Sequence, residues 1–282
     1  MKRAFGDRVA PAFLIDHLYL TGGEVQIRTP DGGEVLLQCR GDDFDPSQIF
    51  WRGLKRYEPE ALLFWALSRE SDAVVDVGAH LGVFSLLAAA ANPHGKVIAV
   101  EPMPDVRSRL LANVHLNAAE RVEVVDAAAS SSDGTAKLVF VPGVSAPSSS
   151  GLNAAFFGGV KTDSVSVPTL RLDTMLSSLG VPLDDVGLLK IDVESHEPDV
   201  ILGMGPLLSR GPTLMVEVLP ESDTADAIQA LTSECGYRFF ELREDGPQET
   251  DRLGTNPAIR NYLLTTLRGD QVRAHWADAL RV

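Results

Sequence analysis

Hydrophobic and polar residues alternate along residues 24–40, and this pattern predicts the first element of the chain. The alternation continues on both sides of PDGG, a glycine-rich turn signal. Apolar residues two positions apart lie on one face of a strand, so the segment predicts a β-hairpin with one buried face. The residues of that face are Val25, Ile27, Val35 and Leu37.

Apolar residues recur at helical spacing between about residues 47 and 68. This spacing predicts one or two helices, with an interruption near Pro59, because proline breaks a helix interior. We interpret residues 1–70 as a β-hairpin and helical cap on a larger domain, which residues 71–282 form.

Strands and helices alternate from residue 72 onwards. The segments AVVDVG, KVIAVE, RVEVVDAA, AKLVFVP, VGLLKIDV and TLMVEVLP are predicted strands, with helical segments among them. RFFELRE and RNYLLTTLR are predicted to form a closing antiparallel pair, and the C-terminal tail a short helix. Repeated units of this kind predict an α/β fold with a mostly parallel, doubly wound sheet. Ligands bind such sheets at the carboxyl ends of the strands.

Residues 142–166 are rich in serine and glycine and are longer than an ordinary connection. We expect them to form a mobile loop over a ligand site. Phe156 and Phe157 in this loop, together with Trp51, are candidates for lining an apolar pocket. The alternative for these three aromatic residues is a place in the core.

The composition excludes several classes of protein. Of 282 residues, 45% are hydrophobic and 23% are charged, as in ordinary globular proteins. The formal net charge of −14 argues against a nucleic-acid partner, because phosphates would be repelled. No window of about 18 apolar residues exists, so we predict no membrane span. Cys39 and Cys235 are isolated, which indicates packing cysteines in a reduced, cytoplasmic protein. Nothing in the sequence defines an oligomeric state.

The segment VVDVGAHLGVFSLLAA, residues 74–89, is the strongest candidate for a binding motif. A predicted strand ends at Asp76, and Gly78 and Gly82 flank a tight turn into a helix. Glycine suits a turn with unusual backbone angles and a ligand close to the main chain. The GxxxG spacing differs from the GxGxxG of dinucleotide-binding loops. A strand-to-helix turn without any ligand is the alternative.

Two further strand ends complete a candidate nucleoside site. Glu101 ends the next strand, where its carboxylate can accept hydrogen bonds from two ribose hydroxyls. Asp126 and the backbone amide of Ala127 follow the third strand, where an adenine edge would lie. The alternatives are a solvated strand end for Glu101 and a surface loop acid for Asp126.

Four segments occur together in one known family. DVGAHLG, AVEP, NVHLN and LLKIDVESHE have the order and spacing of the FkbM family of S-adenosylmethionine-dependent O-methyltransferases, which the chain resembles over roughly residues 55–245. The resemblance implies a Rossmann-like class I methyltransferase sheet, with the cofactor over the first two strands and the acceptor over the fourth and fifth. The residues it implies at the cofactor are Asp76, Gly78 and Gly82 at the methionine part, Glu101 at the ribose and Asp126 beside the adenine.

His80 and Ser195 leave alternatives open within these motifs. His80, inside the glycine turn, is either a cofactor contact or a cap of the following helix. Ser195 stands where the family usually has glycine. Because serine tolerates a positive φ poorly, Ser195 is a candidate capping residue, with Pro198 in the first helical turn.

The acidic stretch LLKIDVESHEPDV supplies candidate catalytic groups. Asp192 ends the fourth strand and is expected to face the methionine end of the cofactor. His196 is a candidate general base, since a neutral histidine suits that role near pH 7. Asp192 or Glu194 is expected to orient its ring. A capping or buried structural histidine is the alternative.

Three more acidic residues belong to this region. Glu217 ends the strand TLMVEV and is expected to bind a sugar-like hydroxyl. In a second mechanism, Asp192 and Glu217 hold Mg²⁺ with one more oxygen ligand and lower the pKa of the acceptor hydroxyl. Glu197 and Asp199 are interpreted as surface charges favoured at a helix N-terminus.

The sequence therefore predicts an enzyme that transfers a methyl group from S-adenosylmethionine to a hydroxyl of a small molecule. A polyketide, a sugar or a glycosylated secondary metabolite is the expected acceptor. An NAD-linked oxidoreductase and a non-catalytic nucleoside-cofactor-binding protein on a similar sheet are the alternatives.

Overall fold

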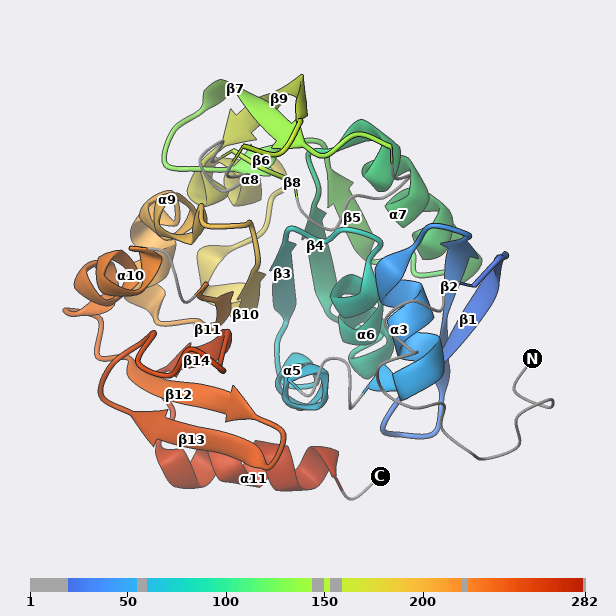
Figure 1. The fold of residues 1–282 in the computed structure, drawn as a ribbon. Coiled ribbons are helices and arrows are strands. Elements are labelled where there is room, and N and C mark those ends of the chain that lie inside the picture. The colour runs from blue at the N-terminus through green and yellow to red at the C-terminus, as the bar shows by residue number, and fades with distance from the viewer. Residues whose placement is uncertain (1–19, 55–59, 144–149, 153–158, 220–222, 281–282) are drawn as a thin grey trace.

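An eight-stranded sheet forms the centre of the molecule (Figure 1). The computed structural model describes residues 20–54, 60–143, 150–152, 159–219 and 223–280. Within them, the strand order of the sheet is β13–β12–β14–β11–β10–β3–β4–β5. The strands from β11 to β5 pair in parallel, and β14, β12 and β13 are antiparallel. The predicted α/β fold with a mostly parallel, doubly wound sheet is confirmed.

The parallel strands place the switch in strand order between β3 and β10. They are β3 (Ala73–Val77), β4 (Lys96–Val100), β5 (Val122–Val125), β10 (Val186–Ile191) and β11 (Thr213–Glu217). The antiparallel strands are β12 (Arg238–Arg243), β13 (Gly246–Thr250) and β14 (Asn261–Thr265). The predicted closing pair is β12 with β14, and β13 adds an outer strand that the pattern did not predict.

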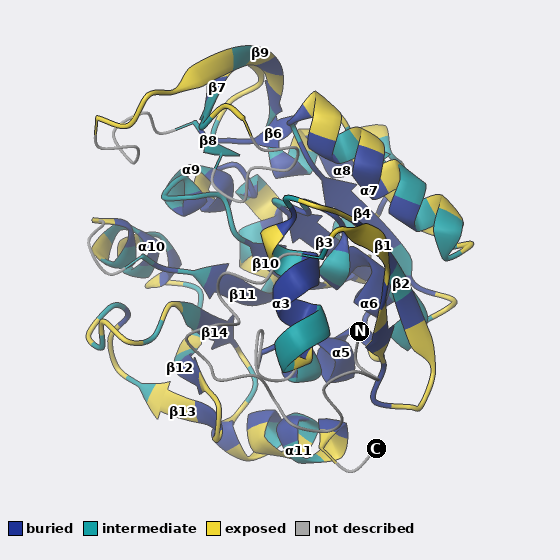
Figure 2. Cartoon of the chain, turned by 45° about the vertical axis from the view of Figure 1, so that its right-hand side comes forward, coloured by how far each residue is buried: buried dark blue, intermediate teal, exposed yellow. Residues whose placement is uncertain are grey.

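Helices cover both faces of this sheet. The first group is α5 (Ala61–Ser68), α6 (Val83–Ala91), α7 (Pro104–Leu116) and α11 (Gly269–Ala279). The second group is α8 (Leu172–Ser178), α9 (Glu197–Leu202) and α10 (Thr224–Thr232). Alternate strand residues such as Val74 and Val75 belong to two separate cores, one under each group. Figure 2 shows central strands that are buried and helices that are exposed on their outer sides. None of the helices in the described ranges is long and apolar enough to span a membrane.

The predicted N-terminal hairpin is confirmed as a separate two-stranded sheet. It consists of β1 (Gly22–Arg28) and β2 (Glu34–Arg40), with Val25 opposite Leu37 and Ile27 opposite Val35. All four of these residues are buried in the same core as α6. Helix α3 (Phe44–Arg52) follows, and Figure 1 shows it with the hairpin beside α6 and α7.

A four-stranded sheet of order β6–β9–β7–β8 corrects two expectations. It consists of β6 (Ala128–Ala129), β7 (Gly134–Phe140), β8 (Ser150–Gly151) and β9 (Asp163–Leu170). The segment AKLVFVP therefore joins this sheet and not the central one, because β7 pairs along its whole length with β9. Part of the expected loop over 142–166 is also strand, because β8 and the start of β9 pair with β7. Phe156 and Phe157 lie outside the described residues.

Candidate active site at the carboxyl ends of the strands

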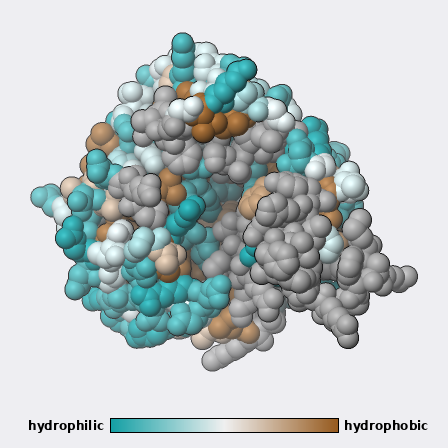
Figure 3. Space-filling view, in the orientation of Figure 1, coloured by the Kyte–Doolittle hydropathy of each residue, from teal (hydrophilic) through white to brown (hydrophobic). Residues whose placement is uncertain are grey.

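A cavity of about 470 Å³ opens at the carboxyl ends of β3, β4, β10 and β11, at the switch point of the sheet. Hydrophilic residues occupy the recessed centre of this face in Figure 3. The predicted cofactor residues Asp76, Gly78, His80 and Glu101 line the cavity, and so do the predicted catalytic residues Asp192, His196 and Glu217. The fold thus brings together residues from four strand ends that are far apart in the sequence.

The glycine turn between β3 and α6 has a physical need for both of its glycines. Gly78 has φ of 82°, and a Cβ there would lie 1.9 Å from the backbone oxygen of Asp192. Gly82 has φ of 91° and is the N-cap of α6. A Cβ on Gly82 would lie 2.4 Å from a methyl carbon of Leu110. Gly78 borders the cavity, whereas Gly82 serves the packing of the turn against α7.

Glu101 is held at the end of β4 by two backbone hydrogen bonds. Its Oε2 accepts one from the N–H of His80 at 3.0 Å, and its Oε1 accepts one from Met103 at 2.8 Å. Burial raises the pKa of Glu101, and these donors and the His80 ring oppose the rise. Each oxygen keeps a second lone pair for a ligand hydroxyl, so the carboxylate suits a ribose.

His80 has φ of 50°, a left-handed conformation that is uncommon for a residue with a side chain. Its Nδ1 lies 3.0 Å from Oδ2 of Asp45 in α3, and its Nε2 is buried without a hydrogen-bond partner among the described residues. The N-cap of α6 is Gly82. His80 is therefore not the cap of that helix, which was one of its two expected roles.

Asp126 and Ala127 do not belong to the residues that line the cavity. The side chain of Asp126 is 61% exposed and pairs with Arg107 at 2.7 Å. Ala127 is fully buried, and the next residues, Ala128 and Ala129, line the cavity in its place. The adenine contact of Asp126 remains a prediction.

Lys190 is a cavity residue that the sequence reasoning missed. Its Nζ donates to Oδ2 of Asp192 at 2.6 Å and lies 4.5 Å from the centre of the Phe84 ring. Asp76 is also buried and accepts a hydrogen bond from Ser85 at 2.6 Å. Burial raises the pKa of Asp76, and the charge of Lys190 opposes that rise. The sequence did contain a signal for this residue, because a lysine inside the apolar strand LLKI is a buried charge and needs a charged or polar partner.

Glu217 lies at the end of β11, half-buried among like charges. Burial, with Asp192 and Glu194 nearby, raises the pKa of Glu217 to about 9. Its carboxyl group is therefore protonated near pH 7 and can donate a hydrogen bond. Over the described ranges, no three His, Cys, Asp or Glu side chains are grouped as metal ligands would be.

His196 has a different partner from the one expected. Its Nδ1 lies 3.5 Å from Oδ2 of Asp199, and its Nε2 lies 3.1 Å from Oγ of Ser130. Because α9 begins at the next residue, position 199 stands one turn further on and beside the ring. Asp192, which was expected to orient the ring, is turned towards Lys190. Burial lowers the pKa of His196, so the ring is neutral near pH 7.

Glu197 is buried and not a surface charge, which corrects the expectation for this residue. Its Oε1 accepts hydrogen bonds from the N–H groups of Val193 and Ser195, both at 3.2 Å. Glu194 and Ser195 have φ of 54° and 69°. Ser195 thus keeps the left-handed conformation and does not cap α9, whose N-cap is His196. The carboxylate of Glu197 supports that backbone.

Pro198 lies in the first turn of α9, as predicted. Asp199 matches its expected exposure, with 46% of its side chain accessible. Arg260, which precedes β14, and Asn261, its first residue, line the cavity without having been predicted. Their signal is absent from the sequence, because β14 pairs with β11 across a long separation in the chain.

The sheet order, the glycine turn after β3 and the carboxylate after β4 define a Rossmann-like class I methyltransferase fold. Residues 76–239 match the methyltransferase FkbM domain. This match covers more than half of the chain. The chain belongs to the FkbM methyltransferase family.

Curated relatives are similar over parts of the chain. The AMB antimetabolite synthetase AmbE of Pseudomonas aeruginosa is 31% identical over 220 residues, which are 64% of this chain and 10% of AmbE. The methyltransferase sdnD of Sordaria araneosa is 31% identical over 195 residues, 58% of this chain and 73% of sdnD. The chain therefore spans only a small part of AmbE.

Two solved structures are also similar. An O-methyltransferase from Bacillus cereus in complex with SAH has a TM-score of 0.43 and 10% identity, and the match covers 75% of this chain and 81% of that one. The O-methyltransferase TomG from Streptomyces achromogenes has a TM-score of 0.40 and 13% identity, with 74% and 80% covered.

Proposed function

We propose that the protein transfers a methyl group from S-adenosylmethionine to a hydroxyl group of a small molecule. The observation that carries this proposal is that residues suited to a nucleoside and residues suited to an acceptor line the same cavity. Glu101 and the glycine turn, suited to a nucleoside, lie on its walls together with the polar groups Asp192, His196 and Glu217. A site that only bound the cofactor would not need the second group.

The residues present fit the cofactor. Glu101 would hold the ribose through its two oxygens, and the bare backbone at Gly78 leaves room where a Cβ would overlap the chain. Asp76 and Asp192 would lie on the methionine side. When bound, S-adenosylmethionine supplies a methyl group that its sulfonium has already activated. The protein then has to align the acceptor and take its proton.

Each of the three polar residues has a proposed role towards the acceptor. Asp192, held by Lys190, accepts a hydrogen bond from a neighbouring hydroxyl of the acceptor, and the protonated Glu217 donates one to another oxygen. His196 is the general base, with Nε2 exchanging Ser130 for the acceptor hydroxyl. Alignment lowers such a barrier by about 7–11 kcal/mol, and a base adds about two to four powers of ten.

The name of one relative supports methylation of an oxygen, and the name of a second supports a sugar-like acceptor. The 31-O-demethyl-FK506 methyltransferase FkbM of Streptomyces tacrolimicus is 30% identical over 161 residues, 48% of this chain and 60% of that one. The hexuronic acid methyltransferase AglP of Haloferax volcanii is 29% identical over 208 residues, 73% of this chain and 81% of that one. Polyketides, sugars and glycosylated metabolites are therefore the first acceptors to test.

Calorimetric titration tests the cofactor, with S-adenosylhomocysteine in one cell and NAD in a parallel cell. We expect micromolar binding of the first and none of the second. Binding of NAD alone would support the oxidoreductase alternative. The titration is repeated with Mg²⁺, and a metal-dependent turnover in the next step would favour the mechanism in which Asp192 and Glu217 hold the ion.

A panel of hydroxyl-bearing acceptors with labelled methyl donor tests turnover. With an active acceptor, His196→Ala should lose about 100-fold or more in kcat while it keeps its affinity for S-adenosylhomocysteine. His94→Ala, which alters an exposed histidine, is the matched control. Unchanged turnover of His196→Ala would remove this residue from the mechanism. Binding without turnover on any acceptor would favour a non-catalytic protein.

A further inference from the structure

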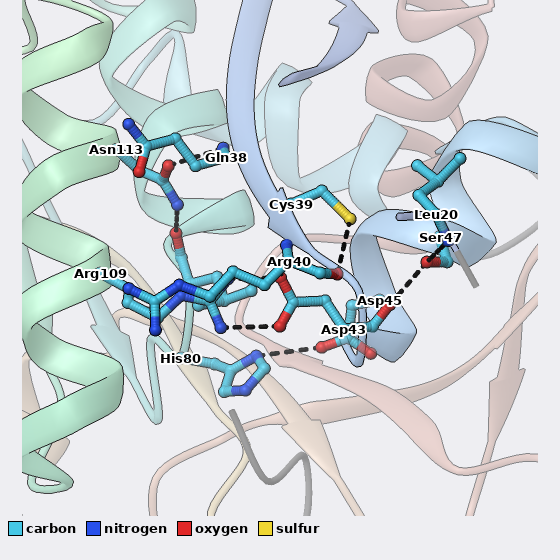
Figure 4. Close-up of polar contacts among 11 residues, drawn as sticks. Leu20, Gln38, Cys39, Arg40, Asp43, Asp45, Ser47, His80, Arg109 and Asn113 are labelled. Atoms are coloured by element: carbon cyan, nitrogen blue, oxygen red, sulfur yellow. Dashed lines mark hydrogen bonds and ion pairs between the residues drawn. The ribbon is translucent and has the colours of Figure 1, made fainter. Parts of the chain in front are cut away.

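Helix α3 lies before the matched family domain and yet contacts the glycine turn. Asp45 of α3 and His80 of the turn form an ion pair, with Oδ2 and Nδ1 3.0 Å apart. Figure 4 shows the two side chains facing each other from these elements. Phe44, Asp45 and Ile49 also line the cavity. One side of the candidate cofactor site is therefore built by residues outside the family domain.

The hairpin before α3 is connected to the same turn through Asn113 of α7. Its Oδ1 accepts a hydrogen bond from the N–H of Gln38 in β2 at 2.9 Å. Its Nδ2 donates to the backbone oxygen of Leu81, inside the turn, at 2.8 Å. Asn113 is fully buried. The first asparagine of the NVHLN motif thus joins β2 to the glycine turn.

A buried ion pair fixes the start of α3 against α7. The Arg109 guanidinium donates to both carboxylate oxygens of Asp43, with Nη1 and Oδ1 2.7 Å apart. Asp43 is 0% exposed and Arg109 is 5% exposed. Asp43 also accepts a hydrogen bond from the N–H of Arg40. With the N-cap of α3 anchored in this way, Asp45 stands in a defined place beside His80.

We propose that Asp45 is a positioning residue for the cofactor. Its ion pair with His80 holds the left-handed turn between β3 and α6, and through that turn the N-terminal segment sets the affinity for the cofactor. The backbone of His80 donates to Glu101, the carboxylate assigned to the ribose. Release of the His80 ring would therefore loosen the turn and Glu101 together. The inference rests on the proposed function only for the identity of the cofactor.

The charged groups facing His80 come from three elements. They are Asp45 on α3, Glu101 at the end of β4 and Arg109 on α7. Burial lowers the pKa of His80, but Asp45 and Glu101 outweigh burial and Arg109, so its pKa is raised. The charged pair is complete below the ordinary value of 6.5 and is lost as the pH rises through the raised pKa.

The first measurement is the affinity of Asp45→Asn for S-adenosylhomocysteine. We expect a loss of about fivefold or more, the lower end of typical coupling between two sites. Asp278→Asn is the matched control, because Asp278 forms an ion pair of the same length, 3.0 Å, with Arg69 on the exposed surface. Near-ultraviolet circular dichroism checks that both variants are folded. Equal affinity of wild type and Asp45→Asn would overturn the inference, whereas a wild type that does not bind would overturn the proposed cofactor.

A second variant, His80→Asn, separates positioning from a general loss of structure. Asparagine tolerates the left-handed conformation, so the turn can persist without the ring. If Asp45 acts through His80, Asp45→Asn adds no further loss of affinity in the His80→Asn background. An equal loss in both backgrounds would overturn the proposal. The ring of His80, followed by NMR, should titrate at a lower pH in Asp45→Asn than in the wild type. An unchanged pKa of His80 would also contradict it.

Discussion

Replacement of Glu197 by glutamine should stabilise the protein at alkaline pH. One oxygen of this fully buried carboxylate accepts hydrogen bonds from Val193 and Ser195, and the other has no partner among the described residues. Glutamine has nearly the same size and keeps an accepting oxygen for the two N–H groups. The substitution therefore removes the charge and leaves the hydrogen bonds in place.

The expected gain in stability of Glu197→Gln follows from the pKa of Glu197. Burial, aided by the charge of Asp192, raises this pKa from 4.5 to about 7, and hydrogen bonds from the backbone oppose the rise. The folded protein thus holds the proton more tightly than the unfolded chain, and stability falls as the pH rises from about 4.5 to about 7. At about 1.4 kcal/mol for each pH unit, the ionised form destabilises the fold by about 3 kcal/mol.

Urea denaturation of Glu197→Gln and of wild type measures this difference. We expect the variant to be more stable by about 3 kcal/mol at pH 8, and by about 1 kcal/mol or less at pH 5. Glu120→Gln, at an exposed position, is the control and should change little at either pH. A Glu197→Gln variant that is less stable than wild type at pH 8 would refute the reasoning, because the ionised carboxylate would then be needed by the turn.

Two further predictions concern left-handed residues. Gly78→Ala places a Cβ 1.9 Å from the backbone oxygen of Asp192 at φ of 82°, so we expect a loss of about 2–4 kcal/mol and no binding of S-adenosylhomocysteine. Gly143→Ala is the control, because Gly143 has φ of 102° and no atom of the described residues within 4 Å of its Cβ position. An equally large loss of stability in Gly143→Ala would assign the effect to backbone strain alone. Ser195→Gly should stabilise the fold by up to about 1 kcal/mol by removing strain at φ of 69°. Denaturation curves measure this gain in stability. A loss of stability would indicate that a contact of the serine side chain outweighs the strain.

Much of this fold and site could be predicted from the sequence, because strand and helix periods record which side chains are buried. The hairpin, the parallel strands and the closing pair of β12 and β14 follow from such local patterns. Strand ends in a parallel sheet meet at one edge. For this reason Asp76, Glu101, Asp192 and Glu217 could be expected at one edge of the sheet from the sequence alone.

The tertiary structure alone decided which strand, charge or hydrogen-bonding group many of these residues contact. The pairing of β7 with β9 and the ion pair between Asp45 and His80 join segments whose contact no local period records. The burial of Glu197 is a second case, because its position at a helix N-terminus indicates a surface charge. The same holds for His196, whose Nε2 meets Oγ of Ser130, a residue 66 positions away in the chain. A residue's tendency to be buried is encoded near it in the chain. The charge or hydrogen bond that it finds there depends on elements brought together only when the whole chain folds.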